Sequence, residues 1–159
     1  MIKIKTNKKR ILFILLVVVS IFVTGCGSKE KTSTNSIKKE MKKAGYIVEE
    51  GATELLESEK AKKVYIFIDK KFTYQIEYYD FKEEKTAEKK FKSIKDLYEA
   101  GKTDKSEDDS TSGGNNERYE ITTDDKYSVV SRIDTTVIYS SAPIKYKEAV
   151  EKAMDNIKY

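Results

Sequence analysis

Cysteine and histidine, the side chains that most often carry nucleophilic, acid–base or metal chemistry, are almost absent from this chain of 159 residues. It contains one cysteine, Cys26, and no histidine. A single cysteine cannot form a disulfide within the chain, and without histidine no zinc site of the Cys/His type can be built. Catalysis with an imidazole general base is also excluded. The residues around Cys26 therefore carry most of the chemical information in the sequence.

The residues before Cys26 have the pattern of a targeting segment. The first ten residues carry five basic side chains and no acidic one, and the 13-residue apolar run Ile11–Val23 follows. A membrane-spanning helix needs roughly 20 apolar residues to cross about 30 Å of hydrocarbon, so this run is short for a span. Its length and its positive flank are typical of a signal peptide. The alternative is a short transmembrane anchor with a chance cysteine.

The four residues Val23, Thr24, Gly25 and Cys26 resemble the lipobox of bacterial lipoproteins, in which an aliphatic residue and two small or β-branched residues precede the cysteine. The resemblance implies that residues 1–25 are a lipoprotein signal peptide and that diacylglycerol is attached to the Cys26 sulfur. Such a lipid would hold the protein on the outer, extracytoplasmic face of the cell membrane, because two acyl chains anchor more firmly than one. The chain as a whole resembles small lipoproteins of low-GC Gram-positive bacteria.

The net charge of +4 belongs to the predicted signal peptide and not to the mature protein. Residues 26–159 hold 26 basic and 27 acidic side chains, a net charge of −1. A nearly neutral chain lacks the basic surface that nucleic acids require, so we expect no nucleic-acid partner.

The mature chain is predicted to be a flexible tether, residues 26–35, followed by one α+β domain, residues 36–159. Apolar spacing predicts helices over 36–44, 52–59, 83–100 and from Pro143 onward, with Gly45 at the C′ position of the first helix. Strands are predicted over 46–48, 64–68, 72–79, 119–123, 127–133 and 136–140. The polar stretch 102–117 has no apolar residue and is predicted to be a mobile loop.

Short connections between neighbouring strands favour antiparallel pairing. We therefore expect a two-layer domain, with an antiparallel sheet of about five strands and helices packed mainly on one face. Strand 72–79 alternates in polarity, which places Tyr74 and Tyr78 on its core face and Tyr79 on the other.

Other candidate motifs give weak signals. The acidic side chains Asp104, Glu107, Asp108 and Asp109 could ligate calcium, but an EF-hand loop that starts at Asp108 would end at Tyr119 where glutamate is required, so a solvated loop is favoured. The sequence predicts no metal and no other cofactor. Ser-x-x-Lys pairs occur only as often as chance predicts, and the stretch around Gly101 lacks the first glycine of a P-loop.

Tyrosine and lysine remain as candidates for an interaction surface. Eleven tyrosines offer apolar area with a polar hydroxyl, which is common at interfaces, although tyrosine is also a good strand former. Three lysines at helical spacing could face an anionic surface, or could be a solvated helix face. The candidate residues are Tyr79, Tyr119, Tyr127, Lys85, Lys89 and Lys92.

These features favour a non-enzymatic binding or adaptor protein of the cell envelope, with a protein, a peptide or an envelope polymer as partner. The first alternative is a small enzyme that uses carboxylate, lysine or tyrosine chemistry on cell-wall polymers, although no catalytic pair stands out among 27 acidic residues. The second is a transporter's solute-binding lipoprotein, for which the mature chain is short.

Overall fold

The computed structural model describes residues 27–159, so the predicted signal peptide and Cys26 lie outside the described residues. The elements confirm the α+β class. In chain order they are α2 (Thr34–Lys43), β1 (Ile47–Glu50), α3 (Thr53–Glu59), β2 (Ala61–Ile68), β3 (Gln75–Phe81), α4 (Glu84–Ala100), β4 (Glu107–Gly113), β5 (Asn116–Thr122), β6 (Lys126–Ile133), β7 (Thr136–Pro143), the 3-10 turn η1 (Ile144–Tyr146) and α5 (Lys147–Asn156).

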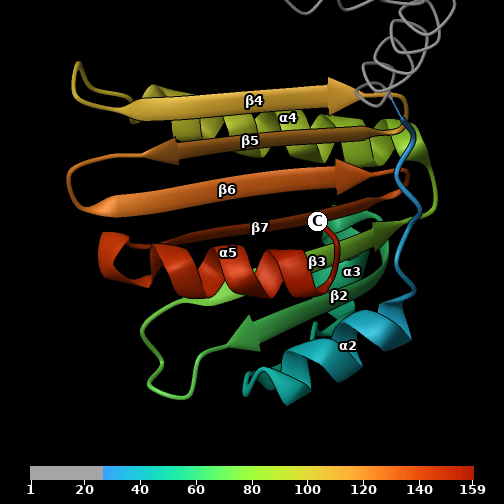
Figure 1. The fold of residues 1–159 in the computed structure, drawn as a ribbon. Helices are drawn as coiled ribbons and strands as arrows, with labels where there is room; N and C mark the ends of the chain where they lie inside the picture. Colours follow the sequence, from blue (N-terminus) through green and yellow to red (C-terminus); the bar gives the residue numbers. More distant parts are fainter. Residues whose placement is uncertain (1–26) are drawn as a thin grey trace, which may run out of the picture.

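All seven strands belong to one antiparallel sheet with the order β1-β2-β3-β7-β6-β5-β4 (Figure 1). The strands β1 to β3 and β4 to β7 form two meanders, and these meet where β3 pairs with β7, with Tyr78 opposite Ile138. The sheet is larger than the predicted sheet of about five strands. The short edge strand β1 and the strand β4 extend it on either side.

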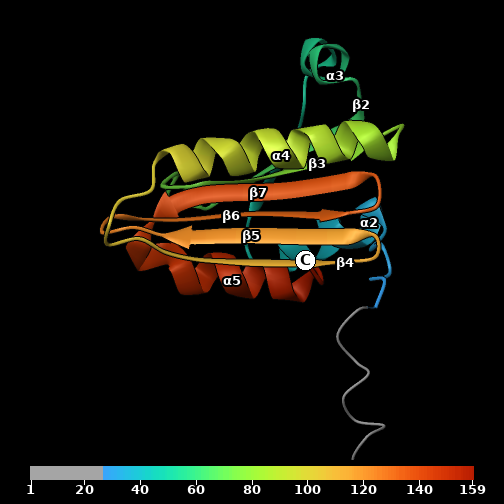
Figure 2. The same ribbon diagram turned by 90° about the horizontal axis from the view of Figure 1, so that it is seen from above.

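Helices cover both faces of the sheet, so the domain has three layers and the prediction of helices mainly on one face is wrong (Figure 2). One core cluster contains Met41 of α2 and Val150 of α5, and the other contains Phe91 of α4. The reason is visible in β6, where Val129 packs into the first cluster and Val130 into the second. A strand with large apolar side chains on both sides must be covered on both sides.

Strand β4 lies within residues 102–117, which the sequence predicts to be a loop. Its seven residues pair with β5 in a regular antiparallel ladder, from Glu107 opposite Thr122 to Gly113 opposite Asn116. The first six side chains of β4 are exposed. Backbone pairing and polar contacts of Asp108 with Lys102 and Tyr119 hold this strand, so no apolar pattern marks it in the sequence. Charged residues on such an edge discourage pairing with other chains.

Residues 27–33, which we call the N-terminal segment, lie along one end of the sheet, although the sequence predicts a flexible tether there (Figure 1). The backbone N–H and carbonyl of Lys29 both bond to the side-chain amide of Asn115, each at 2.9 Å. Lys31 Nζ donates to Asp80 Oδ1 at 3.0 Å. Hydrogen bonds to polar residues at the strand ends hold this segment in place. The tether is predicted because the segment has no apolar residues, and that criterion cannot detect polar contacts with distant residues.

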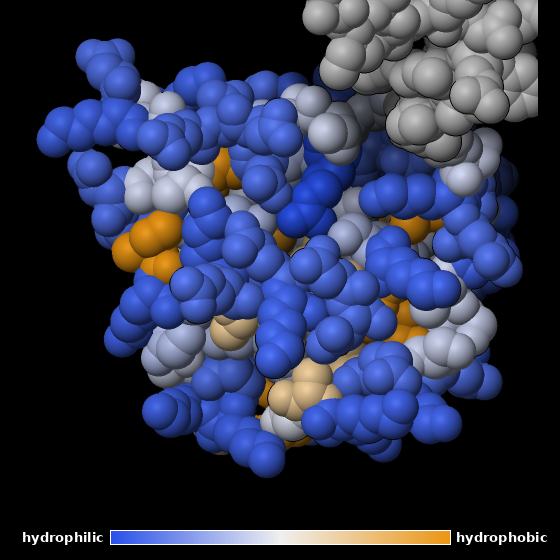
Figure 3. Space-filling view, in the orientation of Figure 1, coloured by the Kyte–Doolittle hydropathy of each residue, from blue (hydrophilic) through white to orange (hydrophobic). Residues whose placement is uncertain are grey.

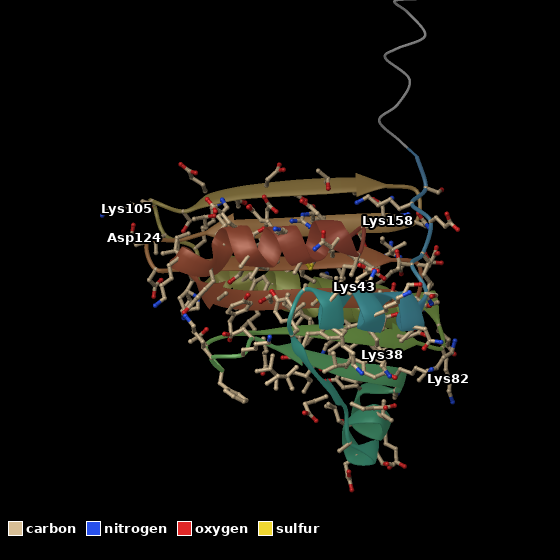
Figure 4. All side chains as sticks on the ribbon, turned by 60° about the horizontal axis from the view of Figure 1, so that its bottom comes forward. Lys38, Lys43, Lys82, Lys105, Asp124 and Lys158 are labelled. Carbon is tan, nitrogen blue, oxygen red and sulfur yellow. The ribbon has the colours of Figure 1, made fainter. Side chains whose placement is uncertain are left out.

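The N-terminal segment and the β2–β3 turn lie at opposite ends of the sheet. Strand β3 has seven residues, starts next to that turn at Gln75 and ends at Phe81, a length of roughly 20 Å at 3.3 Å per residue. Figure 4 labels Lys82 and Lys158 at the end that carries the N-terminal segment, and Lys105 and Asp124 at the other.

Candidate functional site

Three tyrosines of the predicted interaction surface lie inside the protein, so that part of the prediction is wrong. Tyr79, Tyr119 and Tyr127 have exposed fractions of 2%, 1% and 0%. The first two belong to the core cluster under α4, and the third to the cluster under α2 and α5. Because helices cover both faces of the sheet, these three tyrosines are buried although they occupy different faces.

The lysines of the predicted surface are exposed on α4. Lys85, Lys89 and Lys92 all point away from the core. The structure therefore does not bring the predicted lysines and tyrosines together into one surface. The lipobox residues 23–26 lie outside the described residues, and the lipid attachment stays a prediction.

A groove of about 760 Å³ lies where α2, the β2–β3 turn and α5 meet. Residues 40–46 at the end of α2 form one wall, residues 69–74 of the turn form the second, and residues 146–156 of η1 and α5 form the third. We call it the α2–α5 groove. The face of the molecule that carries α2 and α5 is largely hydrophilic, with apolar surface confined to small separate patches (Figure 3).

Three half-buried tyrosines, one from each wall, form a row in this groove. The hydroxyls of Tyr46 and Tyr74 are 2.8 Å apart, and the two rings meet edge to face with centroids 6.1 Å apart. The ring of Tyr146 packs against Tyr74 at a centroid distance of 5.1 Å. Burial raises the pKa of both Tyr46 and Tyr74 above the ordinary 10.0, so these hydroxyls stay neutral hydrogen-bonding groups. We call the three residues the tyrosine row.

Four lysines line the same groove. Lys43 is paired with Glu40, with 2.7 Å between Nζ and Oε1. Lys70, Lys71 and Lys152 have no carboxylate within ion-pair distance in residues 27–159. Three positive charges therefore lie in the groove without a charged partner from the described part of the chain.

One of these lysines lies beside the glycine that ends α2. Gly45 has a φ of +93°, and a Cβ atom there would be 3.7 Å from Cε and Nζ of Lys70. The backbone N–H of Tyr46 bonds back to the carbonyl of Met41 at 3.0 Å. The predicted C′ role of Gly45 is confirmed, because this φ favours glycine, and the Lys70 side chain packs against the same residue.

Positive charge also gathers at the opposite end of the tyrosine row. Lys145 Nζ lies 5.1 Å from the ring centroid of Tyr146. The side chain of Thr73, together with the charges of Lys145 and Lys71, holds the pKa of Tyr146 below its usual range. Lys145 thus places a positive charge beside the Tyr146 end of the row.

The second carboxylate of the groove, Asp69, is engaged in shaping the β2–β3 turn. Its Oδ1 accepts hydrogen bonds from the backbone N–H of Thr73 and Tyr74 at 2.6 and 2.9 Å, and its Oδ2 accepts one from Lys71 N–H at 2.9 Å. Desolvation would raise the pKa of Asp69, but these hydrogen bonds outweigh it and lower the pKa. The aspartate thus acts as a structural cap of the predicted turn.

No protein-family model, curated protein or solved structure matches this chain. The function has to be argued from the groove itself. Among residues 27–159, no helix is both long enough and apolar enough to cross a membrane. The same part of the chain holds no group of three acidic, cysteine or histidine side chains placed for a metal ion, and Asp108 of the acidic stretch pairs with Lys102 instead.

Sequence reasoning did not identify the α2–α5 groove. Its residues come from three segments that are far apart in the chain. The sequence of each segment alone indicates only a helix end or a turn. The one local signal is the pair Lys70 and Lys71 in a predicted turn, four and three residues before Tyr74. That signal does not indicate which helices will lie beside the turn.

Proposed function

We propose that this protein is a lipid-anchored binding protein of the cell envelope and that the α2–α5 groove binds an anionic ligand. The sequence pattern that ends at Cys26 supports the anchor. The observation that carries the binding function is that Lys70, Lys71 and Lys152 line a groove in which both carboxylates, Glu40 and Asp69, are already engaged.

The charge of the groove contrasts with the charge of the rest of the protein. Residues 26–159 have a net charge of −1, whereas four lysines and only two carboxylates line the groove. A concave site with one sign of charge concentrates ligands of the opposite sign. An anion is therefore the ligand class that the groove fits best.

The position of the groove suits a protein that is attached to a membrane through residue 26. The side chain of Asn116, in the β4–β5 hairpin, bonds to the carbonyl of Gly27 at 3.3 Å, so residue 27 lies at that corner of the domain. The groove lies beside the β2–β3 turn, at the opposite end of the sheet. A lipid at the N-terminus would thus leave the groove facing away from the membrane.

The groove fits binding better than acid–base catalysis. A carboxyl group that acts as a general acid or base must be free to exchange a proton with the substrate. Glu40 is paired with Lys43, and Asp69 accepts hydrogen bonds from three backbone N–H groups. These engagements support an adaptor or binding protein over an enzyme of wall polymers.

A nuclear magnetic resonance titration with glucose 6-phosphate, compared with neutral glucose, tests the ligand site. We expect the phosphate to bind and glucose to bind at least fivefold more weakly. The double variant Lys70→Gln/Lys71→Gln should weaken phosphate binding fivefold or more. The control Lys85→Gln/Lys89→Gln removes the same charge from α4 and should change binding less than twofold. Equal losses in both variants would show that only overall charge matters.

Metabolic labelling with radioactive palmitate in a bacterial host tests the anchor. The natural chain should carry the label and sediment with membranes. The variant Cys26→Ala should lose both properties. A labelled and membrane-bound Cys26→Ala protein would contradict the proposed lipid attachment.

A further inference from the structure

We infer that the ligand of the α2–α5 groove is a chain of glycan or polyol units in which successive units carry a negative charge. This inference rests on the proposed function and adds the chemical class of the ligand. It comes from how the charges are arranged along the tyrosine row, and not from the number of lysines.

The tyrosine row has two distinct ends. The centroid separations are 6.1 Å from Tyr46 to Tyr74 and 5.1 Å from Tyr74 to Tyr146, so the row is at most ~11 Å long. Its three rings come from the end of α2, from the start of β3 and from η1. The row therefore crosses the whole groove from one helix to the other.

Positive charge lies at both ends of this row. The side chain of Lys70 lies over Gly45, next to Tyr46. At the other end, Lys145 Nζ lies 5.1 Å from the ring centroid of Tyr146, and Lys71 lines the same groove as Tyr146. The groove thus presents a cation, then aromatic surface, then a second group of cations.

This order matches a ligand in which two negatively charged groups are separated by an uncharged unit. Partly exposed tyrosines offer an apolar ring and a polar hydroxyl, which suits the mixed CH and OH surface of a sugar or polyol unit. A ligand with one charge can reach only one end of the row. When one end is bound, the second charge of a polymer is held close to the other end, and this raises its effective concentration.

The surrounding surface argues against a large apolar partner on this face. Apolar surface there is confined to small separate patches (Figure 3). Extended protein interfaces have a more apolar and better packed centre than this face provides. A charged polymer needs only the narrow groove and its lysines.

Binding affinities for oligomers of increasing length test the inference. They are measured with the full-length protein in uncharged detergent micelles. The phosphodiester probes are glycerol phosphate oligomers with one, two, three and six phosphates. The carboxylate probes are oligogalacturonates of the same lengths, and neutral maltooligosaccharides are the control. We expect affinity to rise at least tenfold between one and three charged units in one of the two anionic series, and the series that shows the rise identifies the charged group. The neutral series should show no such rise.

Variants at the two ends of the row test its role. Lys70→Gln removes the charge at the Tyr46 end, and Lys71→Gln/Lys145→Gln removes those at the Tyr146 end. Each should lower the affinity for three units by fivefold or more and the affinity for one unit by no more than about twofold, because one unit can still use the other end. Lys89→Gln on α4 should leave both affinities within twofold.

The possible outcomes separate the inference from the proposed function. If one unit binds as tightly as three, the polymer inference is wrong and the anion site remains. If no anionic probe binds, both are wrong. If vesicles with anionic phospholipid bind more tightly than every oligomer and are released by Lys70→Gln, the groove faces a membrane surface and the polymer inference is overturned.

Discussion

The hydroxyl groups of Tyr46 and Tyr74 join the end of α2 to the start of β3 through a hydrogen bond of 2.8 Å. The two residues are 28 positions apart in the chain, and their rings meet edge to face. Tyr146 packs against Tyr74 from η1. The hydrogen bond between Tyr46 and Tyr74 sets the spacing between two walls of the α2–α5 groove, so the shape of the groove depends on this bond.

Removing the hydroxyl of either Tyr46 or Tyr74 should break the one hydrogen bond that the two residues share. Tyr46→Phe and Tyr74→Phe should each lower the free energy of unfolding by about 0.5–1.5 kcal/mol. The double variant should lose much less than the sum, because the second change removes a partner that is already gone. Urea denaturation of the four proteins measures this. Additive losses would mean that the two hydroxyls do not interact.

The N-terminal segment should loosen when its side-chain contact is removed. Lys31 Nζ donates to Asp80 Oδ1 at 3.0 Å and to Thr135 Oγ1 at 2.8 Å. Lys31→Ala should lower the free energy of unfolding by about 1 kcal/mol and should speed amide hydrogen exchange in residues 27–33. Mass spectrometry of exchanged peptides measures the second effect.

Lys29 provides the matched control for this experiment, because only its backbone atoms bond to Asn115. Lys29→Ala should leave stability within about 0.5 kcal/mol and exchange unchanged. Equal exchange in the Lys31 and Lys29 variants would contradict the role assigned to the Lys31 side chain.

An exposed aromatic residue at the tip of the β2–β3 turn holds a strained backbone. Phe72 has a φ of 56° and is 72% exposed. This conformation is costly for a bulky side chain and free of strain for glycine. Phe72→Gly should therefore raise the free energy of unfolding by up to about 1 kcal/mol, measured by thermal denaturation. A lower stability would show that the ring makes contacts that outweigh the strain.

Particular residues show what could be predicted from the sequence and what could not. A continuous run of β-branched and aromatic residues from Val64 predicted β2, and alternation around Ile76 predicted β3, because both patterns have a physical cause in burial. Strand β4 has no apolar residue, and its backbone pairing leaves no trace in side-chain pattern. Tyr79 was placed on the correct side of its strand, but the sequence does not reveal that α4 covers that side.

The groove could not be predicted for a related reason. Its tyrosines and lysines are brought together by the packing of α2 and α5 on one face of the sheet, a contact between distant segments. Local patterns identify the elements and their ends, as with Gly45 at the end of α2. They do not specify which elements become neighbours.

The buried tyrosines should make the protein unstable at alkaline pH. Burial raises the pKa of Tyr119 to about 12 and shifts Tyr78, Tyr127 and Tyr139 upward in the same direction. A tyrosine with a raised folded pKa contributes stability that is complete below its unfolded pKa of 10.0 and is lost as the pH rises through the folded value. The free energy of unfolding should therefore fall above about pH 10, for Tyr119 between 10 and about 12.

Denaturant titrations at a series of pH values check this prediction. Tyr119→Phe should make the decline between pH 10 and about 12 shallower than in the natural protein, because one of the shifted groups is gone. An unchanged slope would mean that Tyr119 ionises equally easily in the folded and unfolded chains.

The most direct test of the central claim, that the α2–α5 groove is the binding site, is lysine footprinting with an amine-reactive reagent. The reagent is applied to the full-length protein in its own cell envelope and to the purified protein, and each lysine is quantified by mass spectrometry. We predict that Lys70, Lys71 and Lys152 lose reactivity in the envelope, while Lys85, Lys89 and Lys92 on α4 do not. Protection of the α4 lysines with unchanged reactivity in the groove would contradict the account.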